Sequence, residues 1–272
     1  MTGTAGRLTG LVGLRRLARS ARVSATRLPA AAASALVVPV LVLAAAGPSP
    51  PASPTRVSTT PARPLVRLLF VGASVTAGDY AVDPAHAYPE LVAAGLRSEG
   101  YDTELTVVAH PGATAAAARR WDLSTPSDVV VVHLVTNDFS QDTRPVTYRA
   151  AYAAVIRRLR QASPSARLVC LGGWDNPRAI NRLGVRGGRY DQVARGACAA
   201  AGGAYVDLSA LYLQHADRGP AGEVTTMGVR DGFHPNDRGH RRLAAAVLAT
   251  LDLPPADPTP RHAAAGGPAG RG

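Results

Sequence analysis

The sequence predicts an α/β fold, a three-layer α/β/α sandwich around a mostly parallel, flavodoxin-like five-stranded sheet. Short runs of Val, Leu and other apolar residues alternate along the chain with longer segments that have the apolar period of a helix. A buried parallel strand is apolar on both faces and is joined to the next strand by a helical crossover. The alternation therefore favours a parallel sheet with helices on both faces.

The expected strands and helices follow one another in strict alternation. The runs expected as strands span residues 66–71, 104–109, 128–135, 167–171 and 204–206. The segments expected as helices span residues 88–98, 114–121, 146–161, 189–201 and 235–251. Ligands of such sheets bind at the carboxyl ends of the strands, so the residues that follow each strand are the candidates for a site.

Changes in composition divide the chain into four parts. Residues 1–47 combine an arginine-rich start, an apolar run and small residues, which predicts an export signal or a membrane anchor through residues 30–46. Residues 48–64 are rich in Pro, Ser and Thr, as linkers are. Residues 65–253 carry the alternating elements of the folded domain, and residues 254–272 are expected to be a disordered tail.

The formal net charge of +11 does not indicate a nucleic-acid-binding protein. Eight of the 30 basic residues lie in residues 1–63, which contain no Asp or Glu, so the rest of the chain carries 22 Arg against 19 acids. These charges are interspersed, whereas phosphate-backbone binding needs a concentrated basic stripe. We therefore expect no nucleic-acid partner. The N-terminal segment predicts a secreted or extracytoplasmic protein, or alternatively a single-pass anchored one with its folded domain outside.

The two cysteines leave two alternatives open. Cys170 lies in a run expected as a strand, and Cys198 lies in an Ala-rich segment expected as a helix. In an exported protein they could form a disulfide, or they could pack separately as small buried thiols. No cluster of His, Cys and carboxylate residues has metal-ligand spacing, so we expect no metal and no other cofactor.

A serine follows the first expected strand, where a nucleophile would be presented at the sheet edge. The strand runs into Gly-Ala-Ser-Val-Thr-Ala-Gly, in which glycines on both sides of Ser74 allow a tight turn. Taken alone, such a loop is also typical of a plain turn or a helix cap. Ser74 therefore needs a base before it becomes a candidate nucleophile.

The segment Asp-Gly-Phe-His-Pro-Asn, at residues 231–236, supplies a candidate base. A carboxylate that accepts the Nδ1 hydrogen of an imidazole leaves Nε2 free to take a proton from a serine. Asp231 lies three residues before His234, so one turn can bring them into contact, and Pro235 suits the first turn of a following helix. The alternative is a surface loop with a solvated histidine.

Two more polar segments follow the second and third expected strands. Gly112, in His-Pro-Gly-Ala, can bring its N–H close to a ligand because it has no side chain. Asn137, in Val-Thr-Asn-Asp, can supply an amide donor, and donors of both kinds stabilise the oxyanion of acyl transfer. Each residue alone is also typical of a turn or a cap. Their value is joint, because all four segments are expected at one edge of the sheet.

In this order the four segments resemble the four sequence blocks of the SGNH (GDSL-like) hydrolases, a family of esterases and lipases, over essentially the whole folded part. The resemblance implies serine catalysis with Ser74 as nucleophile, His234 as base and Asp231 orienting that base. It also implies an oxyanion hole formed by the Ser74 and Gly112 N–H groups and the Asn137 side chain.

Two positions depart from the pattern of that family. Its Gly-Asp-Ser is Gly-Ala-Ser here, so Ala73 replaces an acid that is not part of the triad, and we expect local hydrogen bonding to change more than the chemistry. Its Gly-x-Asn-Asp is Val-Thr-Asn-Asp here. The side chain of Val135 adds bulk beside the expected oxyanion site.

Three other residues near the strand ends carry weaker signals. Trp174, after the fourth expected strand, is a candidate wall of the substrate pocket or else a loop residue that covers the sheet edge. His110 lies beside Gly112 and is a candidate for contact with the substrate or for the layer behind it. His133 lies in an apolar strand and is expected to be a hydrogen-bonded core histidine.

The function we expect is hydrolysis of short acyl or acetyl esters through an acyl-enzyme on Ser74, by a monomer that acts on a small-molecule or carbohydrate ester. One alternative keeps the fold but deacetylates or transacylates a polysaccharide, although the chain has only two Trp to stack on sugars. Another alternative is a non-catalytic surface-binding protein in which Val135 has disrupted the oxyanion hole.

Overall fold

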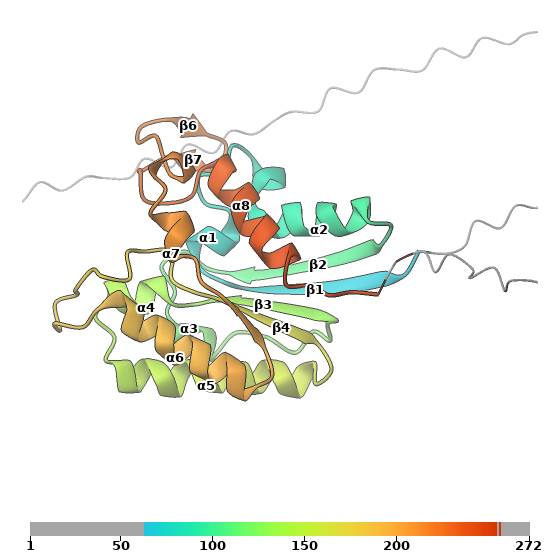
Figure 1. Ribbon diagram of the computed structural model, residues 1–272, viewed down its shortest axis with the longest axis horizontal. Coiled ribbons are helices and arrows are strands. Elements are labelled where there is room, and N and C mark those ends of the chain that lie inside the picture. The colour runs from blue at the N-terminus through green and yellow to red at the C-terminus, as the bar shows by residue number, and fades with distance from the viewer. Residues whose placement is uncertain (1–62, 255, 257–272) are drawn as a thin grey trace, which may run out of the picture. The chain divides into compact units, whose positions relative to one another are not determined.

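The computed structural model describes residues 63–254 and residue 256 (Figure 1). The expected export signal or anchor, nearly all of the expected linker and nearly all of the expected tail lie outside the described residues. Those expectations remain predictions. Within the described part of the chain, no helix is both long enough and apolar enough to cross a membrane.

A parallel sheet lies between two layers of helices (Figure 1). Its five strands are β1 (Leu65–Gly72), β2 (Asp102–Ala109), β3 (Val129–His133), β4 (Arg167–Leu171) and β5 (Ala204–Val206). The spatial order is β2-β1-β3-β4-β5, and every pairing is parallel. The predicted flavodoxin-like α/β fold is therefore confirmed. The connection after β1 leads to β2 on one side, and the connection after β3 leads to β4 on the other side. Where neighbouring connections diverge in this way, parallel sheets have a crevice at the carboxyl ends of the two strands.

Helices cover both faces of the sheet (Figure 1). One face is covered by α2 (Tyr88–Ser98) and α8 (Asp237–Leu248), and the other by α3 (Ala115–Ala118), α5 (Pro145–Ala162) and α6 (Gly187–Ala200). The connections contain the short helices α1 (Ser74–Ala77), α4 (Thr136–Ser140) and α7 (Ser209–Tyr212), two 3-10 turns (Pro84–His86 and His215–Asp217), and the hairpin of β6 (Val224–Thr225) and β7 (Gly228–Val229).

The apolar strands are explained by burial on both faces. Successive side chains of a strand point to opposite faces, so Phe70 and Val131 pack with α2 and α8 whereas Val71 and Val132 pack with the helices of the other layer. None of these four side chains is exposed to solvent. Burying each stabilises the fold by about 1.5–3 kcal/mol. The second layer is completed by the predicted stripe of α5, namely Tyr148, Tyr152, Val155, Ile156 and Leu159.

Some element ends differ from the prediction for local reasons. The helix expected from residue 114 begins at Ala115, because the Thr114 side chain caps it by accepting from the Ala117 N–H, and it ends after one turn. The helix expected from residue 235 begins at Asp237, because Asn236 caps it and accepts from the Gly239 N–H at 3.1 Å. The preceding proline therefore lies before that helix and not in its first turn.

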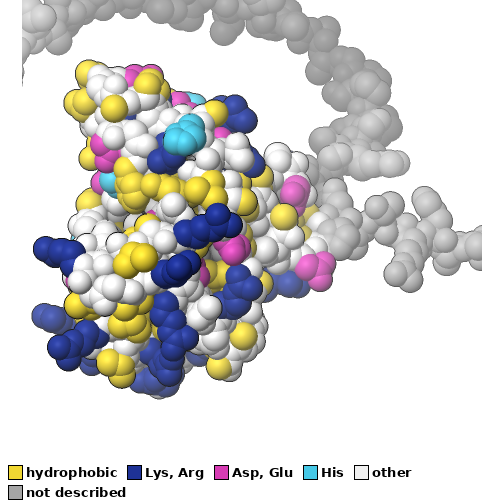
Figure 2. Space-filling model, turned by 60° about the vertical axis from the view of Figure 1, so that its left-hand side comes forward, with side chains coloured by type: hydrophobic (Ala, Val, Ile, Leu, Met, Phe, Trp, Pro, Cys, Tyr) yellow, Lys and Arg dark blue, Asp and Glu magenta, His cyan; other side chains and the backbone are white. Residues whose placement is uncertain are grey.

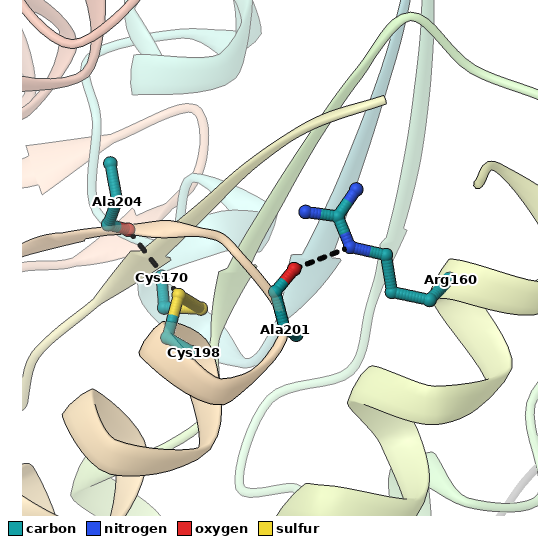
Figure 3. The surroundings of a disulfide bond; sticks show 5 residues. All are labelled: Arg160, Cys170, Cys198, Ala201 and Ala204. Carbon is teal, nitrogen blue, oxygen red and sulfur yellow. Dashed lines mark hydrogen bonds between the residues drawn. A yellow bond between two sulfur atoms is a disulfide. The ribbon is translucent and has the colours of Figure 1, made fainter. Parts of the chain in front are cut away.

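Cys170 on β4 and Cys198 on α6 form a disulfide, with Cα atoms 6.2 Å apart (Figure 3). Of the two alternatives that the sequence leaves open, the structure has the bonded one. The bond ties α6 to the strand beneath it. Nearby, the guanidinium of Arg160 on α5 donates from Nε to the Ala201 carbonyl at 2.9 Å, so the end of α6 is held from two sides (Figure 3).

Candidate active site

Ser74 lies two residues after the end of β1 and is the first residue of α1. The turn into α1 is tight, since a Cβ at Gly72 would lie 2.0 Å from the Thr76 Oγ1. The Thr76 hydroxyl is in turn hydrogen-bonded to the buried Tyr88 hydroxyl at 2.9 Å, which fixes α1 against α2. Gly78 ends α1 at φ +84, a left-handed conformation that suits glycine. The serine is therefore presented by a rigid turn at the carboxyl edge of the sheet.

The structure brings Ser74, His234 and Asp231 together, although the serine is 160 residues from the histidine in the chain. The Ser74 Oγ lies 2.9 Å from Nε2 of His234. Nδ1 of the same ring lies 2.7 Å from Oδ2 of Asp231. A carboxylate can only accept here, so Nδ1 carries the hydrogen and Nε2 is the acceptor for the serine hydroxyl. This is the geometry that the chemistry of a serine–histidine–aspartate triad requires.

The turn that carries the base also holds its carboxylate. Oδ1 of Asp231 accepts from the backbone N–H groups of Phe233 and His234, both at 2.9 Å. Burial by itself would raise the pKa of Asp231, but these N–H groups and the contact with the imidazole outweigh it and lower that pKa below its ordinary value. Gly232 at φ +76 closes the turn. Asp231 is thus held in its ionised form beside the ring.

The candidate oxyanion donors line the same cavity as the serine. Gly112 has φ +77, and a Cβ there would meet no atom within 4 Å, so its conformation and not crowding favours glycine. Among the described residues, neither the Ser74 N–H nor the Gly112 N–H donates to another backbone or side-chain group. Asn137 donates one amide hydrogen to the Ala113 carbonyl at 3.0 Å, which leaves its second hydrogen for the cavity.

The loop that carries Gly112 is tied to α4 by two side chains. Asp138, fully buried, accepts from the Ala115 N–H at 2.7 Å, and Gln141 donates from Nε2 to the Gly112 carbonyl at 2.7 Å. Burial raises the pKa of Asp138 to about 6, against the lowering effects of the Ala115 N–H and the Thr143 side chain. The donors on two different loops are therefore held in one fixed arrangement.

The two departures from the family pattern are accommodated. Val135 has φ −122, outside the left-handed range that favours glycine, so its φ does not require glycine. Its side chain is buried and forms part of the cavity lining, where it reduces the room. Ala73 precedes α1 without a capping side chain, so an acid is not needed to start that helix.

A cavity of about 310 Å³ opens beside the serine. Its lining comes from the loops after β1, β2 and β3 and from the turn that carries the base, namely Ala73, Ser74, Val75, Asp79, Tyr80, Pro111, Gly112, Ala113, His133, Leu134, Val135, Thr136, Asn137, Ser140, Phe233 and His234. Neither at this cavity nor elsewhere does the described part of the chain have a group of three His, Cys, Asp or Glu side chains placed to hold a metal ion. The site consists of hydroxyl, imidazole, carboxylate and amide groups.

His133 differs from its expectation as a hydrogen-bonded core residue. It is among the residues that line the cavity, but both ring nitrogens are buried, and neither forms a well-aligned hydrogen bond with a described residue. Burial lowers its pKa to about 4, opposed by the Gly172 backbone. The imidazole is therefore neutral and buried at the end of β3, with its ring centroid 6.5 Å from that of Tyr88.

The two weaker candidates for substrate contact do not line the cavity. Trp174 is fully buried, with its N–H donating from Nε1 to the Phe233 carbonyl at 2.9 Å, so it supports the turn that carries the base. His110 is exposed and packs on Trp121, with ring centroids 4.7 Å apart. Of the alternatives that the sequence leaves open, the buried position of Trp174 fits a loop residue that covers the sheet edge, and neither Trp174 nor His110 lines the cavity. The sequence correctly locates each residue after a strand, but it does not show in which direction the side chain points.

Two further residues line the cavity that were not expected from the sequence. Asp79 and Tyr80 follow α1 directly, and the left-handed turn at Gly78 sends them back toward the base. The Tyr80 ring centroid lies 4.7 Å from that of His234. The sequence feature that could have indicated them is the acid and the aromatic residue that directly follow Gly78.

Comparison with known proteins agrees with this geometry. The model of the GDSL-like lipase/acylhydrolase family matches residues 70–242. No curated protein gives a significant match. Among solved structures, TesA is 23% identical with a TM-score of 0.53 and aligns 68% of this chain with 98% of its own. A carbohydrate esterase family 2 enzyme from Corynascus thermopiles (Myceliophthora fergusii), with a carbohydrate-binding domain, is 19% identical with a TM-score of 0.54 and aligns 72% with 69%.

Phospholipase A1 from Streptomyces albidoflavus NA297 is 20% identical with a TM-score of 0.50 and aligns 68% of this chain with 99% of its own. At these identities the solved structures establish a shared fold. The family model covers more than half of the chain, including the segments of Ser74, Gly112, Asn137 and His234. The chain belongs to the GDSL-like lipase/acylhydrolase family.

Proposed function

We propose that the protein is a serine esterase that hydrolyses carboxylic esters through an acyl-enzyme on Ser74. The Ser74 Oγ attacks the ester carbonyl while Nε2 of His234 takes its proton. The oxyanion of the tetrahedral intermediate accepts from the Ser74 and Gly112 N–H groups and from the Asn137 amide. His234 then returns the proton to the leaving alcohol, and a water molecule releases the acid by the same route in reverse.

The observation that carries this proposal is the 2.9 Å contact between the Ser74 hydroxyl and the imidazole of His234. Hydroxyl groups are weak nucleophiles unless a base removes the proton, and this base is oriented by Asp231 at 2.7 Å. The cavity beside the serine is small and partly filled by Val135, which favours a short acyl group such as acetyl.

The proposal is tested with a Ser74→Ala variant of the full chain. We expect the turnover of a short-chain aryl ester to fall by about 10⁴-fold or more, because the attacking oxygen is lost while oxyanion donors remain. The thermal unfolding midpoint should stay close to that of the wild type. Ser98→Ala is the matched control, since Ser98 is exposed at the end of α2 and donates only to the Gly95 carbonyl. Wild-type turnover by the Ser74→Ala variant would rule out the assignment.

An acetylated polysaccharide is a second candidate substrate, favoured by the fold shared with the carbohydrate esterase named above. Among the cavity-lining residues only Tyr80 and Phe233 have aromatic rings, apart from the two histidines, which offers little surface for stacking on a sugar chain. Parallel assays with acetylated xylan and an aryl acetate distinguish the two classes. A kcat/KM for xylan far above that for the aryl ester would favour the polysaccharide.

The non-catalytic alternative requires that Val135 has disrupted the oxyanion hole. The negative φ of Val135 and the open Gly112 and Asn137 donors argue against that disruption. A fluorophosphonate probe provides the test, because it reacts only with an activated serine. We expect a single adduct on the peptide that contains Ser74, and absence of labelling would favour a binding protein.

We further propose that the protein is secreted, on the basis of the N-terminal sequence alone. The test is the N-terminal residue of protein recovered from culture medium. A new N-terminus between the apolar run and residue 65 would support cleavage of an export signal. Recovery of the intact chain with the membrane fraction would instead support an anchor.

A further inference from the structure

We propose that the leaving-group side of the cavity binds a cationic alcohol, so that esters of amino or quaternary ammonium alcohols are preferred over neutral ones. The recognition elements are the carboxylate of Asp79 and the aromatic ring of Tyr80. This inference rests on the proposed esterase function and names the substrate class of the same site.

The first observation is an unpaired carboxylate in the cavity. Asp79 lines the cavity with Ser74, and its backbone N–H donates to the Ser74 carbonyl at 3.0 Å, which fixes its position next to the nucleophile. Among the described residues, its side chain forms no hydrogen bond and no ion pair, and it is only partly exposed. Burial raises the pKa of Asp79, and the charge of His234 opposes that effect. A half-buried carboxylate without a partner is unfavourable, and a bound cation would supply the partner.

The chemistry of the reaction places this carboxylate on the alcohol side of the ester. His234 must return a proton to the alcohol oxygen, so the alcohol leaves on the side of the imidazole. Asp79 is close enough to influence that imidazole electrostatically, and the Tyr80 ring packs at 4.7 Å from it. The acyl carbonyl oxygen, in contrast, points to the donors at Gly112 and Asn137. A positive charge near Asp79 therefore belongs to the alcohol.

The second observation is that the aromatic wall is held in place by several contacts. Tyr80 has φ +67, a conformation that is strained for a residue with a large side chain. Its carbonyl accepts from Nε of Arg230 at 2.9 Å, and its N–H donates to the Met227 carbonyl at 3.4 Å. A Cβ at Gly228 would lie 3.1 Å from the Tyr80 ring, so the β6–β7 hairpin packs directly on it. The face of an aromatic ring attracts ammonium groups.

Nearby positive charge does not compensate Asp79. The guanidinium of Arg230 is ion-paired with Glu223 and, at 3.0 Å, with Asp237. Figure 2 shows arginine side chains as the main charged groups over the lower half of the molecular face in that view. Among the described residues, no arginine forms an ion pair with Asp79.

The test compares two acetate esters with the full-length protein at physiological ionic strength. Acetylcholine carries a trimethylammonium group, and its neutral isostere carries a tert-butyl group in the same place, so size and shape are matched. We expect kcat/KM to be about tenfold higher for the cationic ester, as for a partly solvated charge pair. In Asp79→Asn the ratio of the two kcat/KM values should fall to about twofold or less, and this ratio is the readout. In Asp79→Glu the preference should persist.

Asp102→Asn is the matched control, because it removes the same charge from an exposed position at the start of β2, at the opposite edge of the sheet. It should retain the full preference. Tetramethylammonium gives an independent readout: it should competitively inhibit hydrolysis of the neutral ester by the wild type, about tenfold more weakly in Asp79→Asn.

The failure of this inference is distinct from the failure of the proposed function. Equal kcat/KM values for the two esters in the wild type would overturn the cationic subsite and leave the esterase intact. The subsite is also overturned if Asp79→Asn lowers both values in parallel, since Asp79 would then position His234 without contacting the alcohol. Hydrolysis of neither ester, together with absence of fluorophosphonate labelling, would overturn the esterase itself.

Discussion

Asp175 provides a prediction whose size follows from the structure. It lies after β4, is only 5% exposed, and neither of its carboxylate oxygens has a hydrogen-bond partner among the described residues. Burial, and then the negative charge of Asp191, raise its pKa from the ordinary 3.8 to about 7. Asp191 itself accepts from the Gly173 N–H and the Tyr205 hydroxyl, both at 2.8 Å, so it is the better satisfied of the two acids.

The pH dependence has a defined sign. In the unfolded chain Asp175 releases its proton near the ordinary pKa, whereas in the folded protein it keeps that proton up to about pH 7. The folded state therefore binds more protons between these two values, and the free energy of unfolding falls as the pH rises through this window. A tenfold change in proton affinity corresponds to about 1.4 kcal/mol, so the full cost of ionising Asp175 is up to ~4 kcal/mol.

Asp175→Asn imitates the protonated acid and cannot ionise. We expect it to raise the free energy of unfolding by about 2–4 kcal/mol near pH 8 and by less than about 1 kcal/mol near pH 4. Urea denaturation of the full chain, followed by circular dichroism at both pH values, measures this difference. The buried Asp138 also titrates in this range, but it is present in both proteins and its contribution cancels. Asp102→Asn should change neither value, and an equal effect of Asp175→Asn at both pH values would refute the reasoning.

Three further predictions concern the triad, the oxyanion donors and the disulfide. Asn137→Ala should lower kcat by about 10²–10³-fold with little change in KM, because the amide acts on the oxyanion and not on the bound ester; an unchanged kcat would remove it from the site. Asp231→Asn should lower kcat by about 10⁴-fold at neutral pH, since the wrong tautomer of His234 is then favoured, and activity close to that of the wild type would contradict this role. Reduction of the disulfide by dithiothreitol should lower the free energy of unfolding, measured in urea, by about 3–4 kcal/mol, because the bonded residues are 28 apart in the chain. Identical urea curves with and without reductant would show that the bond contributes nothing.

The inner strands β1, β3 and β4 could be predicted from the sequence because nearly all of their residues are buried. Such strands need apolar residues at nearly every position, and β4 has the predicted bounds. The edge strand β5 also has the predicted bounds, although its residues are exposed or only partly buried. The helix α2 is also predicted to the residue, since Pro89 in its first turn and an apolar face at helical spacing mark it clearly. The buried residues of β4 and of α2 are the apolar ones that the pattern marks, so local pattern and tertiary structure agree.

The short connections could not be predicted in the same way. Helices α1, α4 and α7 have one turn each, which is too short for an apolar period to develop. The β6–β7 hairpin has strands of two residues, and its place is fixed by contacts with Tyr80 and Arg230, of which the tyrosine is far away in the sequence. Such elements depend on tertiary contacts that no local pattern records.

For the site, the order of polar segments after strands was sufficient to name the residues that converge on the cavity. It did not give the direction of individual side chains, and this is why the sequence left two positions open for Trp174, at the cavity wall or covering the sheet edge, whereas the structure buries it outside the cavity lining. It also did not identify Asp79 as a cavity residue, because a left-handed turn brings it back toward the base. Direction is decided by turns and by packing, which residue order does not contain.

Asp79 and Asp175 both break the rule that a buried or half-buried carboxylate has a partner, and the two cases have different consequences. Asp79 faces the cavity, so a ligand can supply what the protein leaves open, and its replacement should reduce selectivity. Asp175 does not line that cavity, so nothing that binds there can satisfy it, and its replacement should increase stability. Measuring stability and selectivity on both variants tests this distinction. We expect Asp79→Asn to gain stability and lose the preference for the cationic ester, and Asp175→Asn to gain stability alone. That result would show that an unpaired acid contributes to ligand binding only where it lines the cavity.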